Sequence, residues 1–196
     1  MGIIIKRLTP DLVEDYIHFF DITPHWDYSE RDELPCYCVT WRSDDSFDDD
    51  NPHWYFSREE RREKAISFVK GRKIQGYLAY DDERVVGWCN ATDDCQGGVN
   101  YFRSYYPIEE YGKDIRVKSI FCLMIAPDMK RKGIATQLVE RVCIDAKNEG
   151  FNFVEAYPNV EYTVLDHKGP LTMYEKFGFT KSVEQEGRVV VRKELI

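Results

Sequence analysis

Residues 117–150 read VKSIFCLMIAPDMKRKGIATQLVERVCIDAKNEG, and this stretch decides the fold. It begins with a continuous apolar run that stops at Pro127, as expected for a strand buried on both faces. After a basic turn, apolar residues recur at helical spacing until Gly150, a residue that favours a helix end. The stretch therefore predicts a buried strand followed by a helix that opens on three positive charges.

The basic turn, KRKG at residues 130–133, stands where the predicted helix begins. The first N–H groups of a helix lack intrahelical partners and carry the positive end of its dipole, so they bind phosphate. Lys130, Arg131 and Lys132 add charge there, while Gly133 and Ala135 keep side chains away from an approaching anion. The alternative is a solvated basic turn that only opens a core helix, because short Lys/Arg runs are common on surfaces.

The segments around this stretch predict a mixed α+β order. Runs of β-branched and aromatic residues predict strands, and helical spacing with capping residues or a final glycine predicts helices. Strands are expected within 2–9, 75–94 (a hairpin), 117–127, 151–158, 179–183 and 187–195, and helices within 12–22, 57–72, 134–150 and 169–179. The sequence has no repeat or long linker, so we expect residues 1–196 to form a single domain with one central strand–helix–strand crossover.

The composition limits the class of protein. With 43% hydrophobic and 32% charged residues, and no apolar run near the roughly 18 needed to cross a membrane, the sequence predicts a soluble globular protein with no membrane partner. Its first residues lack the apolar core of a signal peptide, so a cytoplasmic location is expected. The excess of 35 Asp and Glu over 27 Lys and Arg argues against a nucleic-acid partner and favours a cationic one.

The six cysteines, at positions 36, 38, 89, 95, 122 and 143, are expected to be reduced thiols in such a protein. No CxxC pair is present. Cys36 and Cys38 are flanked by strand-forming residues, which would place both thiols on one face of a strand. A thiol or metal protein built on this pair is one alternative, but the C-x-C signal is weak and we expect no metal.

A family resemblance adds to these observations. The segment IAPDMKRKGIATQL, residues 125–138, followed some thirty residues later by LTMYEKFGF, residues 171–179, resembles the acetyl-CoA-binding core of the GNAT superfamily of N-acetyltransferases. The family's pattern is Arg/Gln-x-x-Gly-x-Gly/Ala after a strand ending in x-Pro; Gly133 and Ala135 fit it, and Lys130 departs from its first position. The resemblance covers residues 115–180. It implies an α+β, GNAT-like fold, with a central twisted mixed sheet, helices on both faces and two splayed parallel strands.

The resemblance also implies a cofactor site. Acetyl-CoA would bind where the parallel strands within 119–127 and 153–158 splay apart. Backbone groups of Leu123, Met124 and Ile125 would pair with the pantetheine arm like an added strand, and one backbone N–H of this strand would stabilise the developing oxyanion. The N–H groups of the basic turn would hold the pyrophosphate; they belong to Arg131, Lys132, Gly133, Ile134, Ala135 and Thr136.

Transfer to an amine needs an acid and a base, because an alkylamine is protonated at neutral pH and the leaving thiolate needs a proton. Tyr174 stands at the family's usual position for the tyrosine that protonates the CoA sulfur; the alternative is an aromatic residue packed beneath a short helix. For the base we favour Glu155, whose strand would lead into the acceptor site. The alternatives are a solvent-facing Glu155 on an edge, or water as the base.

Two positions depart from the family pattern. His167 stands where members often have an asparagine that contacts the cofactor, and it could donate a similar hydrogen bond, serve as a base or lie on the surface beside Lys168. Pro170 replaces an alanine, which suggests that the last helix begins late.

The acceptor side is expected within residues 24–56, an irregular acidic and aromatic segment that includes DDSFDDD at 44–50, and within the aromatic segment 101–111. We therefore expect a cationic small-molecule or peptide amine, such as a polyamine, an amine-bearing antibiotic or a lysine side chain. The alternative is a solvated acidic loop beside core aromatics. A non-catalytic acyl-CoA sensor or interaction domain of the same fold is also compatible with the sequence, and so is a homodimer.

Overall fold

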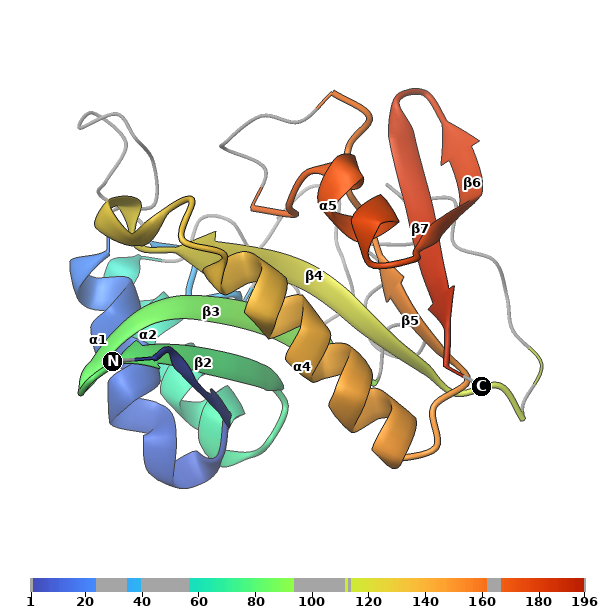
Figure 1. Cartoon of the computed structure of the whole chain (residues 1–196). Coiled ribbons are helices and arrows are strands. Elements are labelled where there is room, and N and C mark those ends of the chain that lie inside the picture. The colour runs from blue at the N-terminus through green and yellow to red at the C-terminus, as the bar shows by residue number, and fades with distance from the viewer. Residues whose placement is uncertain are drawn as a thin grey trace.

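The computed structural model describes residues 2–23, 35–39, 57–93, 112, 114–161 and 167–195 (Figure 1). Strands and helices alternate irregularly along these residues, as the sequence predicts for a mixed α+β chain. The elements in chain order are β1 (Ile4–Arg7), η1 (Pro10–Leu12), α1 (Val13–Ile22), α2 (Arg58–Lys70), β2 (Gly76–Asp81), β3 (Arg84–Thr92), β4 (Val117–Ile125), η4 (Pro127–Met129), α4 (Ile134–Asn148), β5 (Phe153–Ala156), α5 (Leu171–Lys176), β6 (Thr180–Gln185) and β7 (Arg188–Glu194).

Within the described residues the strands form one seven-stranded sheet, in the order β1-β2-β3-β4-β5-β7-β6. β4 and β5 run parallel, and every other neighbouring pair is antiparallel. The helix α4 joins β4 to β5, which is the crossover that a parallel pair requires. The expected mixed sheet with one central crossover is confirmed.

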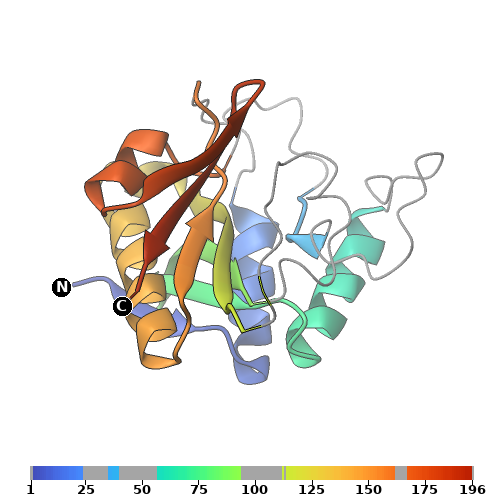
Figure 2. The same ribbon diagram turned by 90° about the vertical axis from the view of Figure 1, so that its right-hand side faces the viewer.

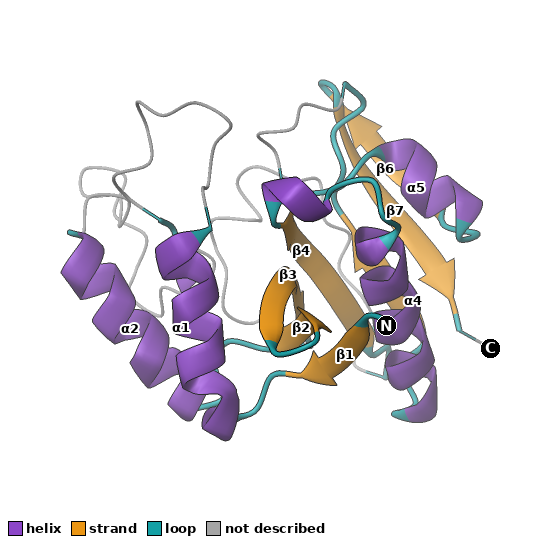
Figure 3. Cartoon of the chain, turned by 60° about the vertical axis from the view of Figure 1, so that its left-hand side comes forward, coloured by secondary structure: helices purple, strands orange, loops and turns teal. Residues whose placement is uncertain are grey.

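Helices cover both faces of this sheet, with α1 and α2 on one side and α4 on the other (Figure 3). Alternation along the strands gives each face its own core. Leu78 and Trp88 pack with the apolar residues of α1, whereas Ala79 and Val86 pack with those of α4. Ser57 begins α2 with a capping box, in which its hydroxyl accepts from the Glu60 N–H and the Glu60 side chain accepts from the Ser57 N–H.

The parallel strands separate part of the way along β4. Their pairing ends at Ile120 and Ala156, while β4 continues to Ile125, so the two strands diverge beyond this point (Figures 1 and 2). At the same place Cys122 pairs with Asn90 of β3 and Ile120 pairs with Ala91, which leaves Phe121 as the extra residue of a β-bulge. The predicted splay is therefore present, and a bulge marks where it begins.

The strand expected around Cys36 and Cys38 is wrong. Tyr37 and Cys38 have positive φ angles of 46° and 52°, so this segment turns instead of extending. Cys38 is buried against the indole of Trp88, whose Nε1–H donates to its sulfur over 3.2 Å. The described residues contain no cluster of His, Cys, Asp and Glu arranged to hold a metal.

The acidic and aromatic segments expected on the acceptor side fall almost entirely outside the described residues, as does Cys95. Among the helices that the structure describes, none is both long and apolar enough to cross a membrane.

Candidate active site

A pocket of about 680 Å³ opens between the end of β4, the first turn of α4, residues 167–170 and α5. Its size lies within the range typical of small-molecule and cofactor sites. Most residues that the sequence analysis assigned to the cofactor line it: Leu123, Met124, Ile125, Arg131, Gly133, Ile134, Ala135, Thr136 and His167. Lys132 does not, because its ammonium turns back to lie 3.2 Å from the sulfur of Met129.

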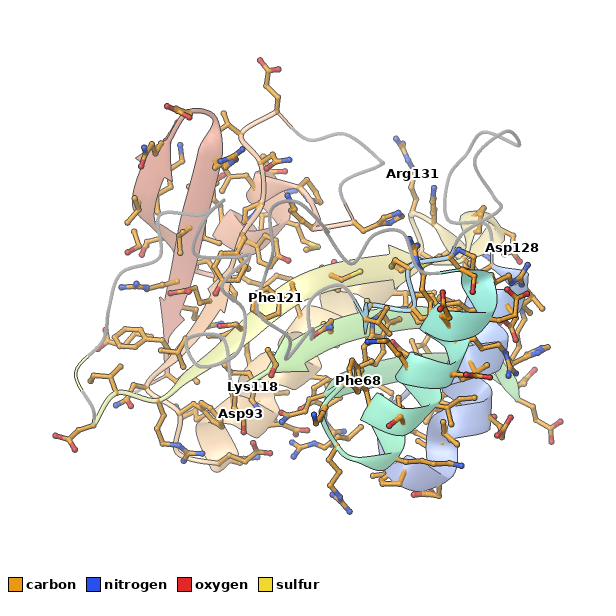
Figure 4. All side chains as sticks on the ribbon, turned by 180° about the vertical axis from the view of Figure 1, so that it is seen from behind. Phe68, Asp93, Lys118, Phe121, Asp128 and Arg131 are labelled. Carbon is orange, nitrogen blue, oxygen red and sulfur yellow. The ribbon has the colours of Figure 1, made fainter. Side chains whose placement is uncertain are left out.

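The turn before α4 leaves its backbone open to a ligand. Gly133 is the N-cap residue, with φ 77° and ψ 9°, and no side chain caps the N–H groups that follow it. A Cβ placed on Gly133 would meet no atom within 4 Å, so the space in front of this backbone is empty of protein. Arg131, which also has a positive φ, and Lys130 add exposed charge at this end of β4 (Figure 4).

Only alternate residues of β4 turn their backbone toward the splay. The Leu123 N–H donates to the carbonyl oxygen of His167, across the gap between the strands, whereas the Ala126 N–H donates to Val86 of β3. By strand alternation, Ile125 faces the splay with Leu123, and the backbone of Met124 faces β3. The backbone pairing expected from Met124 is therefore wrong, because its groups already belong to the sheet.

Residues 167–170 form the opposite wall of the pocket. His167 has a φ of 46°, and it reaches β4 through its backbone carbonyl rather than its side chain. Gly169 is tightly packed, since a Cβ there would lie 2.8 Å from the end of Met173 and 3.2 Å from Leu123. Pro170 is the N-cap residue of α5, which confirms the late helix start.

Tyr174 is completely buried, and its hydroxyl donates to the carbonyl oxygen of Lys168 over 2.7 Å. Its ring packs edge-on against Phe179. The hydroxyl thus bonds to the segment that forms the pocket wall, although Tyr174 itself does not line the pocket. To serve as the acid it must turn its proton away from Lys168, so its catalytic role stays a prediction.

Glu155 is also completely buried, so the alternative of a solvent-facing carboxylate is wrong. Arg192 donates from Nε to its Oε2 over 2.7 Å, and the Tyr157 hydroxyl donates to its Oε1 over 2.6 Å. Sequence reasoning missed both partners. The two-residue spacing of Glu155 and Tyr157 on one strand face was the available signal for Tyr157, whereas Arg192 comes from the distant strand β7.

One ion pair next to the basic turn was not predicted from the sequence. Arg84, at the start of β3, forms a bidentate ion pair with Asp128 of η4, with N–O distances of 2.7 and 2.9 Å. The guanidinium of Arg84 holds the pKa of Asp128 below its usual value. Asp128 lies three residues before Arg131 (Figure 4). Its ion pair with Arg84 therefore offsets the negative charge of the Asp128 carboxylate beside the pocket.

Comparisons with known proteins agree with this geometry. A model of the acetyltransferase (GNAT) family matches residues 6–179, and no curated protein matches the chain. Similar solved structures include the PaiA N-acetyltransferase of Thermoplasma acidophilum in complex with coenzyme A, at 17% identity over 99% of both chains and a TM-score of 0.58.

YncA of Salmonella typhimurium, solved with its cofactor acetyl-CoA, is 12% identical over 100% of this chain and 95% of that one, with a TM-score of 0.52. The ribosomal-protein-S18-alanine N-acetyltransferase of Escherichia coli is 10% identical over 99% and 94%, with a TM-score of 0.54. Identities this low show a shared fold, whereas the family model covers most of the sequence. The chain therefore belongs to the acetyltransferase (GNAT) family, a family of acyltransferases.

Proposed function

We propose that this protein moves an acetyl group from acetyl-CoA to a primary amine of a cationic acceptor, by direct attack within a ternary complex. The observation that carries the proposal is the pocket, in which an open helix N-terminus without a side-chain cap and the edge of β4 that faces away from β3 border the same space. The first suits a pyrophosphate and the second suits an amide-bearing arm.

The residues present fit the cofactor. The Gly133 turn offers N–H donors without a Cβ in front of them, and Arg131 and Lys130 supply positive charge. The backbone of Ile125 faces the splay and would pair with the pantetheine, and Leu123 would join it once its N–H leaves the His167 carbonyl. When bound, acetyl-CoA supplies the acetyl group as a thioester. Tyr174 remains the proposed acid and Glu155 the proposed base.

The acceptor is proposed from charge. The whole chain carries a net charge of −8, and a cationic amine would be attracted to such a protein. The segments within 24–56 and 101–111 are the proposed acceptor side, and residues 1–196 the proposed single domain. A small molecule and a peptide amine are both compatible with this reasoning, and a cytoplasmic location stays a prediction.

Calorimetric titration of residues 1–196 with acetyl-CoA tests the site, and CoA release with spermidine, an aminoglycoside and a lysine-containing peptide tests the transfer. We expect binding, and CoA release that depends on the amine. Binding without release by any amine would favour the non-catalytic acyl-CoA domain. Absence of binding would mean that the cations of residues 130–132 are only surface charge.

A further inference from the structure

A line of buried polar side chains lies where β4 and β5 separate. The Tyr157 hydroxyl donates to Glu155, which also accepts from Arg192, and the Tyr157 oxygen lies 3.1 Å from the hydroxyl of Ser119. Ser119, Glu155 and Tyr157 are at most 1% exposed. A continuous line of hydrogen bonds thus runs from Ser119 through Tyr157 and Glu155 to Arg192.

The strand register places this line at the point where β4 and β5 begin to diverge. Ser119 pairs with Glu155 one step before the pairing ends, and Tyr157 directly follows the last paired residue of β5. The Tyr157 ring stacks on Phe121, the bulge residue of β4, with centroids 5.2 Å apart and the planes 8° from parallel. The two rings therefore bridge the diverging strands; Figure 4 labels Phe121.

The line lies on the face of the sheet opposite to most of the apolar lining of the cofactor pocket. Val154 and Ala156 of β5 pack in the core under α4, so Glu155 and Tyr157, which alternate with them, face the other way. Leu123 of the pocket belongs to the α4 side. An acceptor that reaches the splay from the face opposite the cofactor would therefore meet the Tyr157 side first.

We propose that Tyr157 takes the proton from the acceptor amine and passes its own proton to Glu155, so that Glu155 acts only through Tyr157. This inference rests on the proposed function. Both oxygens of Glu155 already accept hydrogen bonds, one from Arg192 and one from Tyr157, so in this arrangement a proton reaches the carboxylate through the Tyr157 hydroxyl. Arg192 is a positioning residue that fixes the carboxylate.

Every proton that moves in this relay can be accounted for. A phenol has one proton, which here points to Glu155, so the Tyr157 oxygen would take an incoming proton on a lone pair. One proton moves from the ammonium to Tyr157 as the Tyr157 proton moves to Glu155, leaving a neutral amine, an unchanged tyrosine and a neutral acid. The C–N bond then forms as the C–S bond breaks. The nitrogen, which carries two protons after the attack, loses one of them to become the amide. The thiolate gains a proton, and Glu155 returns its proton to water.

Tyr157→Phe tests the relay, with Tyr80→Phe as the matched control. Both changes remove a largely buried tyrosine hydroxyl that donates to a carboxylate, over 2.6 Å to Glu155 and 2.7 Å to Asp15. Tyr80 lies on β2, away from the splay. CoA release is measured at neutral pH with spermidine, whose amines are protonated, and with hydroxylamine, which is already neutral.

With spermidine we expect Tyr157→Phe to lower kcat about 10²- to 10³-fold, the range of general base catalysis. The hydroxylamine rate and the Kd for acetyl-CoA should stay within about twofold, because neither needs the proton transfer. Tyr80→Phe should leave both rates unchanged. Glu155→Gln gives a second test, since glutamine keeps the shape of the side chain but takes no proton, although its single carbonyl oxygen can accept from only one of the two donors. It should show the same selective loss.

Equal losses with both probes would mean that Tyr157 is structural, and full spermidine activity would mean that it moves no proton; either result overturns the relay while acetyl transfer stands. Wild-type protein that binds acetyl-CoA but acetylates neither probe nor any amine of the panel would overturn the proposed function and the relay with it.

Discussion

Replacing Gly133 with alanine tests the proposed phosphate-binding role of the turn at residues 130–133 separately from its effect on the stability of the fold. Gly133 has a φ of 77°, and an L-residue in this left-handed region costs about 1–2 kcal/mol. The methyl group itself clashes with nothing, since no atom lies within 4 Å of it, and the smaller entropy of the unfolded chain returns about 0.4–1 kcal/mol. We therefore expect a net loss of about 1 kcal/mol in the free energy of unfolding, or about 2–4 °C in Tm.

The same methyl group should weaken acetyl-CoA binding, because it would stand between the exposed N–H groups and a phosphate. We expect the Kd to rise about tenfold or more, which corresponds to about 1.4 kcal/mol. Gly133→Glu should abolish binding, since it adds both bulk and negative charge.

Gly187→Ala is the matched control. Gly187 also has a φ of 77° and an empty space where a Cβ would lie, but it stands in the turn between β6 and β7 and does not line the pocket. Thermal unfolding should show similar losses for both variants, and calorimetry should show weaker acetyl-CoA binding only for Gly133→Ala. Equal Kd values for the two variants would refute the assignment of the phosphate turn.

Tyr174→Phe should lower kcat about 100-fold with little change in acetyl-CoA affinity, and full turnover in a CoA-release assay would mean that this tyrosine only packs. Arg84→Met should raise the Kd for acetyl-CoA about two- to fivefold at low salt, because Asp128 loses its partner beside the pocket; Arg84→Met with Asp128→Asn should restore the affinity, and calorimetry at two salt concentrations checks both. Burial lowers the pKa of Lys118 below its usual 10.5, so between the lowered value and 10.5 the unfolded chain binds more protons and stability rises with pH. In denaturant titrations Lys118→Met should show a smaller rise over that window than the wild type, and an identical rise would contradict this reasoning.

The elements near the pocket could be predicted because their signals are local. The apolar run of β4, the helical spacing of α4 and the glycine between them lie within one stretch of sequence, and the structure keeps them in that order. The start of α2 also has a local signal, because Ser57 is a favourable capping residue directly before the helix.

Contacts between distant segments could not be predicted in the same way. Arg84 and Asp128 are 44 residues apart, and Glu155 and Arg192 are 37 apart, so no local pattern joins them. The bulge at Phe121 depends on the register between two strands, which the sequence of one strand does not determine. At residues 36–39 the sequence predicted a strand and the structure has a turn, because tertiary packing overrode the local strand propensity.

The two faces of β5 carry different kinds of residue, and the proposed function would account for the difference. On the α4 face the strand carries Val154 and Ala156, the small apolar residues that packing against a helix favours. On the other face it carries Glu155, paired with Arg192, although replacing a buried ion pair with apolar residues is often neutral or stabilising. Folding alone therefore gives little reason to keep a carboxylate at this position, and a proton acceptor at the mouth of the splay gives a direct one.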